Sequence, residues 1–288
     1  MENTQEYHLH KNDLSRLHFE MNEAKPYCDT NVEHCFKSHR HSFYQIIWFK
    51  SAGRHYVDYQ AYEHPENTLF FINKNQVHRF CTDSKNEGIL FHFDDVFISS
   101  YDKKVENRFL YSLFSGVGDI HIGLNLSDKA RVASLSDILQ QELAEKKKDF
   151  QLEIFLIFHA LLLFLERTKV GSEVESKHVT DPLFHIAVQF KIEVNAHLPI
   201  FKPLDYYYDV LNVTSKKLAS ASKKYLKDTP NNIIHKEKLL EAKRLLLNSS
   251  LTIQEVAYSL GYDQSTYFTK VFKSFFNMTP KEFKAIIS

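Results

Sequence analysis

The chain has 288 residues, of which 43% are hydrophobic and 14% aromatic, and its formal net charge is zero. The length suggests about two domains, and the composition excludes a disordered or collagen-like protein. The three cysteines are too few for a disulfide framework, and no apolar run approaches the ~20 residues that span a bilayer. We therefore expect reduced thiols at Cys28, Cys35 and Cys81, a cytoplasmic location, and neither a membrane segment nor a signal peptide.

Short strands are predicted between Phe43 and Phe93. The five segments are Phe43–Phe49, His55–Tyr59, Thr68–Ile72, His78–Cys81 and Ile89–Phe93. Glycine, proline and asparagine turn signals at 52–53, 65–67 and 73–75 separate them. This close spacing is typical of an all-β barrel or sandwich.

One face of this barrel is predicted to form a small-molecule pocket. Alternation places the odd-numbered residues from 39 to 49 on one side of the chain, which we expect to point inward. The inward residues combine apolar walls with a few polar groups, the usual composition of a ligand site. They are His39, His41, Phe43, Gln45, Ile47, His78 and Phe80.

Two helical patterns follow between Ser127 and Thr168. The first runs through Val132, Leu135, Leu139 and Leu143, and the second through Phe155, Phe158, Leu162 and Leu165. The second is apolar over most of its surface, which favours a homodimer interface, although packing against its own barrel alone stays open. Residues 171–180 are polar and show no periodic pattern of apolar residues, which indicates a linker.

The C-terminal third contains an internal repeat. Apolar residues at helical spacing in the first copy recur 49 residues later in the second: Leu204, Tyr207, Tyr208 and Leu211, then Ile253, Val256, Ala257 and Leu260. Each helix ends at a residue that tolerates positive φ, Asn212 or Gly261. Each copy then continues at an offset of 50 to a Thr-Pro pair, 229–230 or 279–280. This is the helix-turn-helix plan, and a helix within 232–248 joins the copies.

The second helix of each copy separates into a buried and an outward side. In the second copy the predicted buried stripe is Phe268, Val271, Phe272 and Phe275. The outward groups are small, polar or basic, which suits base edges and phosphates. They are Lys216, Lys217, Ser220, Lys223 and Lys224 in the first copy, and Ser265, Thr266, Thr269, Lys270 and Lys273 in the second. A solvated lysine face explains one such helix equally well, but two copies with the same turn favour DNA.

The distribution of charge agrees with a DNA-binding module at the C-terminus. From Lys202 onward there are 14 Lys and Arg against 8 Asp and Glu, which leaves 22 against 28 before that point. A basic C-terminal third joined to an acidic remainder of the chain is by itself weak support for DNA binding, because many ordinary surfaces carry as much charge.

These motifs resemble the AraC/XylS family of bacterial transcription regulators. The similarity runs through 241–246 (EAKRLL), 251–257 (LTIQEVA), 260–262 (LGY), 267–268 (YF), 271–273 (VFK) and 279–280 (TP). It implies a seven-helix DNA-binding domain from about Asp181 to the end. It also implies base-reading positions at Lys216, Lys217 and Ser220 in the first copy, and at Ser265, Thr266 and Lys270 in the second. The first copy departs from the pattern at Ser222, where a buried phenylalanine is usual, and at Lys227, where a glycine is usual.

The segments 39–45 and 76–80 resemble the cupin-like effector domain of many members of this family. His39, His41, Gln45 and His78 stand where metal-binding cupins carry two histidines, a carboxylate and a third histidine. Gln45 lacks the charge of that carboxylate, and Asn73 and Asn75 replace an expected proline and glycine. A metal-free pocket is therefore favoured over a bound metal.

The sequence thus predicts an α+β multidomain protein. Its parts are a cupin-like barrel (1–126), a helical dimerisation segment (127–170), a linker (171–180) and an all-α double helix-turn-helix domain (181–288). The predicted function is a sequence-specific transcription regulator controlled by a small-molecule effector, without catalytic residues or cofactor. Its predicted partners are double-stranded DNA, the effector, RNA polymerase and a second copy of the chain. The alternative is a cupin-type metalloenzyme, an isomerase or dioxygenase with a helical appendage, but this leaves the repeat unexplained.

Overall fold

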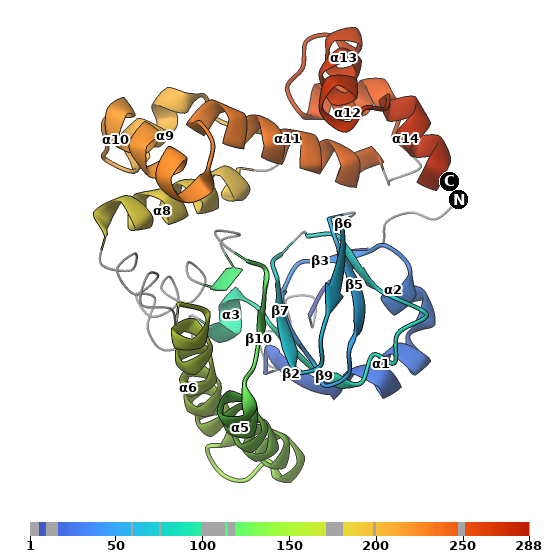
Figure 1. The fold of residues 1–288 in the computed structure, drawn as a ribbon, viewed down its shortest axis with the longest axis vertical. Coiled ribbons are helices and arrows are strands. Elements are labelled where there is room, and N and C mark those ends of the chain that lie inside the picture. Colours follow the sequence, from blue (N-terminus) through green and yellow to red (C-terminus); the bar gives the residue numbers. More distant parts are fainter. Residues whose placement is uncertain are drawn as a thin grey trace. The chain divides into compact units, whose positions relative to one another are not determined.

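The chain forms two compact units, Glu6–Lys177 and one that includes His178–Ser288. Figure 1 shows strands in the first unit and helices alone in the second. The computed structural model describes residues 6–9, 17–58, 60–74, 76–98, 113–114, 119–170, 181–197, 200–246 and 251–287. Within these ranges, no helix has both the length and the apolar character needed to cross a membrane.

The N-terminal unit is built on two antiparallel sheets (Figure 1). The larger has the order β10 (His121–Gly123), β7 (Thr68–Ile72), β4 (Tyr44–Phe49), β9 (Gly88–Phe93) and β2 (Phe19–Glu23). The smaller has the order β6 (Gln60–His64), β5 (Gly53–Val57) and β8 (His78–Phe80). A short parallel pair joins β1 (Glu6–Tyr7) to β3 (Arg40–His41). The segment 68–72 has its predicted bounds, whereas β2, β6 and β10 were not predicted.

Alternation along the strands divides the larger sheet into two faces. In β4, Ile47 and Phe49 belong to a buried cluster with Phe70 and Phe80, which brings both sheets together. The helices α1 (Ala24–Thr30) and α2 (Val32–Phe36) add Cys28 and Cys35 to this interior cluster. The odd-numbered residues of β4 therefore point inward, as the strand period requires.

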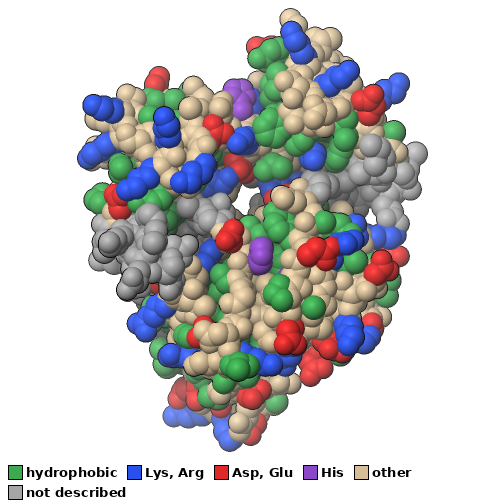
Figure 2. All heavy atoms as spheres, viewed as in Figure 1, with side chains coloured by type: hydrophobic (Ala, Val, Ile, Leu, Met, Phe, Trp, Pro, Cys, Tyr) green, Lys and Arg blue, Asp and Glu red, His purple; other side chains and the backbone are tan. Residues whose placement is uncertain are grey.

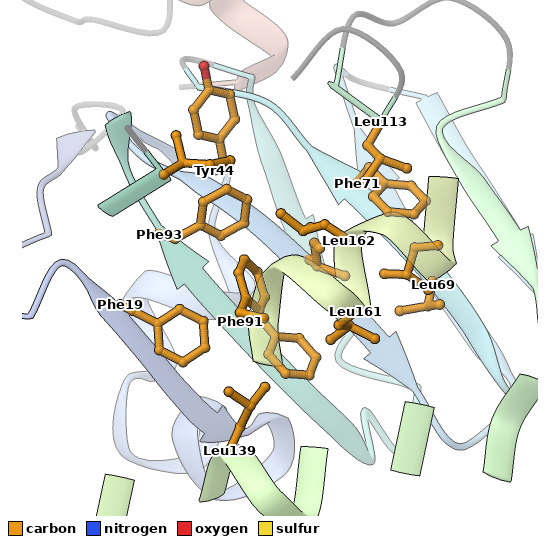
Figure 3. Packing of buried hydrophobic residues seen from close by; sticks show 14 of the residues in the cluster. Phe19, Tyr44, Leu69, Phe71, Phe91, Phe93, Leu113, Leu139, Leu161 and Leu162 are labelled. Atoms are coloured by element: carbon orange, nitrogen blue, oxygen red, sulfur yellow. The ribbon is translucent and has the colours of Figure 1, made fainter. Parts of the chain in front are cut away.

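The opposite face of the larger sheet is covered by two long helices, α5 (Leu126–Glu145) and α6 (Phe150–Val170). Figure 3 shows side chains of Phe91 and Phe93 meeting Leu161 and Leu162 in this second buried cluster. A short helix, α3 (Asp95–Ile98), contributes to the same cluster. Leu152 and Leu156 of α6 remain 39% and 58% exposed, so the sheet covers one side of this helix and not the other.

The described residues of the C-terminal unit form seven helical segments, two of them in each helix-turn-helix copy. They are α8 (Pro182–Ala196), α9 (Leu204–Val210), α10 (Ser215–Ala221) with its continuation η2 (Ser222–Leu226), α11 (Pro230–Leu246), α12 (Ile253–Ser259), α13 (Ser265–Phe276) and α14 (Pro280–Ile287). Side-chain caps fix several of the starts. Thr252 and Glu255 form a capping box on α12, and Thr279 and Glu282 bond in the same way before α14.

Helix α11 runs between the two helix-turn-helix copies, as Figure 1 shows. On one side Glu237 forms a buried ion pair with Lys191 of α8. On the other side the Lys243 ammonium lies 4.1 Å from the ring centre of Phe276 and 5.2 Å from that of Phe283. Ile233 of the same helix packs with Tyr207 and Leu218 of the first copy. At 17 residues the helix is about 25 Å long, and these contacts join it to α8 and to both copies.

Candidate DNA-binding surface and effector site

The turns of the two helix-turn-helix copies repeat one another bond for bond. In the first, the N–H groups of Leu211, Asn212 and Val213 donate to the carbonyls of Tyr207, Asp209 and Tyr208 over 3.2, 3.1 and 3.0 Å. In the second, those of Leu260, Gly261 and Tyr262 donate to Val256, Tyr258 and Ala257 over 3.2, 2.9 and 3.0 Å. All six residue pairs are related by the offset of 49. The middle residue has φ +50° at Asn212 and +72° at Gly261, the conformation that the sequence predicted.

The residues predicted to face DNA lie outward in both copies. Those that are exposed are Lys216, Lys217, Ser220, Lys223, Lys224, Thr266, Lys270 and Lys273. Ser265 and Thr269 are half-buried, and the Thr269 hydroxyl donates to the Ser265 carbonyl over 2.9 Å. Figure 2 shows lysine and arginine side chains on the surface around α10 and others around α13, whereas α9 and α12 themselves contain none.

The buried side of the second copy differs from the prediction at Phe275, and Val271 is only half-buried. Phe268 and Phe272 are fully buried, but Phe275 is 44% exposed and does not belong to the buried stripe. Its neighbour Phe276 packs instead, with its ring centre 4.7 Å from that of Phe272. Both residues lie within one helical step of the stripe, so spacing alone could not decide between them.

The second helix of the first copy differs in shape from its counterpart. It changes from α-helix to a π-turn at Ser222, whose buried hydroxyl has no partner among the described residues, and it ends at Lys227 with φ +58°. Helix α13 is α-helical throughout and ends at Asn277 with φ +57°. The two departures from the family pattern, at Ser222 and Lys227, thus coincide with the two ends of an irregular turn.

The seven residues predicted for the effector pocket are all buried in the N-terminal unit. Their exposed fractions are at most 4%, for His39, His41, Phe43, Gln45, Ile47, His78 and Phe80. The structure brings the histidines together, since His41 Nε2 lies 3.0 Å from His78 Nε2. Gln45 interacts with His41 as well, while its amide nitrogen donates to His92 Nε2 over 2.8 Å.

Hydrogen bonding fixes the direction of a chain of three imidazoles. His41 Nδ1 lies 2.7 Å from the Phe43 carbonyl, which only accepts, so this nitrogen carries the proton. In a neutral ring, His41 Nε2 then accepts from His78 Nε2, and His78 Nδ1 accepts from His55 Nε2 over 3.2 Å. The remaining nitrogen, His55 Nδ1, is left as a buried acceptor without a partner in the described part of the chain.

His64 presents a second unpaired acceptor in the same region. Its Nδ1 donates to the Pro65 carbonyl over 3.1 Å, which leaves Nε2 as a buried acceptor to which no described residue donates a hydrogen bond. The ring lies face to face with Phe49, at 4.4 Å between centres, and His55 lies 5.4 Å from the same phenylalanine. Phe70 borders both imidazoles as well. Two unpaired acceptors thus flank one aromatic surface.

Four imidazoles of the barrel interior are uncharged near neutral pH. Burial lowers the pKa of His41 to about 3 and that of His55 to about 3, and it lowers the pKa of His39 and His78 well below the usual 6.5. No three His, Cys, Asp or Glu side chains within the described ranges are grouped so as to hold one metal ion. The interior is therefore polar but carries no permanent charge at these positions.

Sequence reasoning missed His55, His64 and His92 as part of this interior. His55 stands two residues before Val57, an interior residue, so the strand period could have identified it. His64 belongs to a strand that was not predicted. His92 shares its face with Leu90, but the predicted strand was not assigned an inward side.

Two comparisons with known families match the two units. Residues 29–93 match the AraC-like ligand binding domain, and residues 207–286 match a helix-turn-helix domain. The chain belongs to the AraC/XylS family of transcription regulators. It is a DNA-binding regulator whose N-terminal domain is the effector-binding domain of the family, joined to a C-terminal helix-turn-helix domain.

Individual members of the family are distant from the chain in sequence. The HTH-type transcriptional activator RhaS of Escherichia coli O6:H1 is 21% identical over 263 residues, which cover 86% of this chain and 87% of RhaS. The xylose operon regulatory protein of Haemophilus influenzae is 32% identical over 114 residues, 39% of this chain and 28% of that protein. The solved structure of ToxT from Vibrio cholerae O395 is 16% identical with a TM-score of 0.42, over 95% of this chain and 99% of its own.

Proposed function

We propose that this regulator reads its operator with both helix-turn-helix copies. Helix α13 reads one half of the site through Ser265, Thr266 and Lys270, and α10 reads the other through Lys216, Lys217 and Ser220, about one helical turn (~34 Å) away. Phosphate contacts come from Lys223, Thr269 and Lys273, and from Lys224 when its ammonium is released from the Asp181 carboxylate. The observation that supports this proposal is the bond-for-bond repetition of the turn, with an outward polar face on each second helix.

The salt dependence of DNA binding tests the phosphate contacts. Each lysine that neutralises a phosphate contributes ~0.9 to the slope of log K against log salt. The double variant Lys223→Ala/Lys273→Ala should therefore bind all sequences more weakly, with a slope smaller by about 1.8. Lys85→Ala/Lys148→Ala removes the same charge from exposed positions of the N-terminal unit and serves as the control. An unchanged slope in the first variant would rule out both contacts.

We propose that the effector binds in the barrel interior. The residues of this binding site are His39, His41, Phe43, Gln45, Ile47, His78 and Phe80, together with His55 and His64. A buried acceptor left unpaired costs about 1–3 kcal/mol. An uncharged ligand with hydroxyl or amide N–H groups would offset that cost at His55 Nδ1 and His64 Nε2. Because both nitrogens are enclosed, a ligand enters only if interior side chains move, and that movement couples binding to a change of conformation.

The pocket residues are tested through the response to effector. A panel of uncharged polyols, sugars and amides, screened for an increase in Tm, first identifies a ligand. Gln45→Ala/His78→Ala should then abolish the effect of this ligand on operator binding, while the affinity without ligand stays close to that of the wild type. A double variant that responds with the wild-type midpoint and amplitude would place the ligand outside the barrel.

Further partners and properties are proposed together with this function. Leu152 and Leu156 on α6, with Ile138 on α5 at 43% exposure, favour a homodimer through these helices. RNA polymerase is proposed as a further partner, and the cytoplasm as the location. We propose no catalytic activity, in keeping with relatives that are transcription regulators. Stoichiometric metal in the purified protein would instead favour the cupin-type metalloenzyme.

A further inference from the structure

Asp181, the first described residue of the C-terminal unit, joins three hydrogen-bond donors through one carboxylate. Its Oδ1 accepts from the Leu183 N–H over 2.8 Å, which caps α8. Its Oδ2 accepts from Lys224 Nζ over 2.5 Å and from the Tyr225 hydroxyl over 2.6 Å. The start of the unit is thereby tied to the last turn of the first copy's second helix.

Lys224 lies on the side of that helix that is proposed to face DNA. It follows Ser220 by four residues, about one turn of the helix, which places the two on one side, and it is exposed like Ser220. Its side chain is 49% exposed, whereas that of Asp181 is 20% exposed. A DNA phosphate and the Asp181 carboxylate are both anions that accept from an ammonium, so they compete for the same Nζ.

The second copy has no counterpart to this contact within the described residues. At the offset of 50, Lys224 corresponds to Ser274 and Tyr225 to Phe275, neither of which offers an ammonium or a phenol. The contact is therefore not part of the shared helix-turn-helix framework. The hydrogen bonds from Lys224 and Tyr225 also hold the pKa of Asp181 below its usual range, so the carboxylate stays charged at neutral pH.

We propose that Asp181 is an autoinhibitory residue of the first helix-turn-helix copy, which withholds Lys224 from the phosphate backbone and so lowers the affinity for DNA. This inference rests on the proposed role of α10 and η2 in DNA binding. Asp181 directly follows 171–180, the segment between the barrel's helices and the DNA-binding domain in the sequence. A shift of the chain at this entry point moves the carboxylate and releases Lys224.

Asp181→Asn separates the two roles of the carboxylate. Asparagine is as good an N-cap as aspartate, so it still accepts from the Leu183 N–H, but it no longer holds Lys224 by charge. The full-length protein is titrated with a random-sequence DNA duplex at several salt concentrations, because non-specific binding reports phosphate contacts. The variant should bind about two- to fivefold more tightly, the worth of one exposed ion pair, with a slope steeper by up to ~0.9.

Lys224→Gln, made both in the wild-type chain and in the Asp181→Asn chain, shows whether Lys224 is responsible for the gain. In the wild-type chain it should change the slope little, since Lys224 is already withheld, and in the Asp181→Asn chain it should abolish the gain. Asp205→Asn removes the same charge from an exposed residue of α9 and controls for general repulsion; any gain it brings should persist with Lys224→Gln. A normal slope for Asp181→Asn, or weaker binding, would show that Asp181 positions the helix and does not inhibit. A wild-type slope in Lys223→Ala/Lys273→Ala would instead contradict the proposed DNA surface itself.

Discussion

Acidification from pH 7 to pH 5 is predicted to destabilise the barrel through its buried histidines. Their pKa is near 6.5 in the unfolded chain but about 3 in the folded one for His41 and His55. The unfolded state therefore binds more protons between these values, so the stability present above pH 6.5 is lost as the pH falls toward 3. Between pH 7 and pH 5 the loss is about 2 kcal/mol for each histidine, or about 4 kcal/mol for the two. His39 and His78 add to it in the same direction.

Trp48 provides the assay for this prediction. It is the only tryptophan of the chain and is 1% exposed, so its fluorescence reports the unfolding of the barrel unit. Guanidinium titrations of the full chain at pH 7 and pH 5 give the two free energies of unfolding. In His55→Phe, where phenylalanine replaces an imidazole packed among phenylalanine rings, the pH effect should be smaller by about 2 kcal/mol. If the wild-type free energy is equal at both pH values, the interior imidazoles are not held neutral and the reasoning fails.

Three substitutions test other parts of the molecule. Lys270→Ala should relax base preference in one half of the operator only, at a cost of about 1–3 kcal/mol in binding free energy if the contact is bidentate to guanine. The measurement is the affinity for operators with changes in one half-site, and an equal loss of affinity for every operator would make Lys270 a phosphate contact. Leu156→Glu should convert a dimer to monomers in sedimentation equilibrium, whereas Leu126→Glu, 85% exposed at the start of α5, should not. Gly261→Ala should lower the free energy of unfolding of the C-terminal unit by about 1–2 kcal/mol, because φ is +72° and no atom crowds the added methyl within 3.4 Å; an unchanged denaturation midpoint by circular dichroism would contradict this.

The repetitive parts of the fold could be predicted from the sequence because local periods determine them. The strand 68–72 and the two helices near 127–168 follow from apolar alternation and from helical spacing. The strand β6 could not be predicted in this way. The predicted segment His55–Tyr59 ran through a turn at Asp58, whose φ of +46° starts the return strand. A turn formed by aspartate without a following glycine gives a weak signal in the sequence.

In the candidate sites, too, the sequence predicts what a local period determines and not what depends on contacts between distant elements. The outward lysines and the inward residues of β4 follow from periods within one element. The contact between His78 and His55 depends on the pairing of β5 with β8, where Val57 lies opposite His78. The link from Asp181 to Lys224 spans 43 residues, and no local pattern indicates it. Contacts of this kind arise from tertiary packing, which a single sequence does not reveal.

The π-turn at Ser222–Leu226 makes the proposed phosphate contacts of the first copy differ from those of the second. A π-helix advances the chain by about 4.4 residues per turn in place of 3.6, so side chains after Ser222 are rotated relative to their counterparts in α13. The proposed base-reading residues Lys216, Lys217 and Ser220 precede this turn, whereas the proposed phosphate contacts Lys223 and Lys224 lie within it. A set of phosphate contacts worked out for one copy therefore does not carry over to the other. A hybrid made by exchanging the two helices would change the phosphate contacts as well as the base-reading residues.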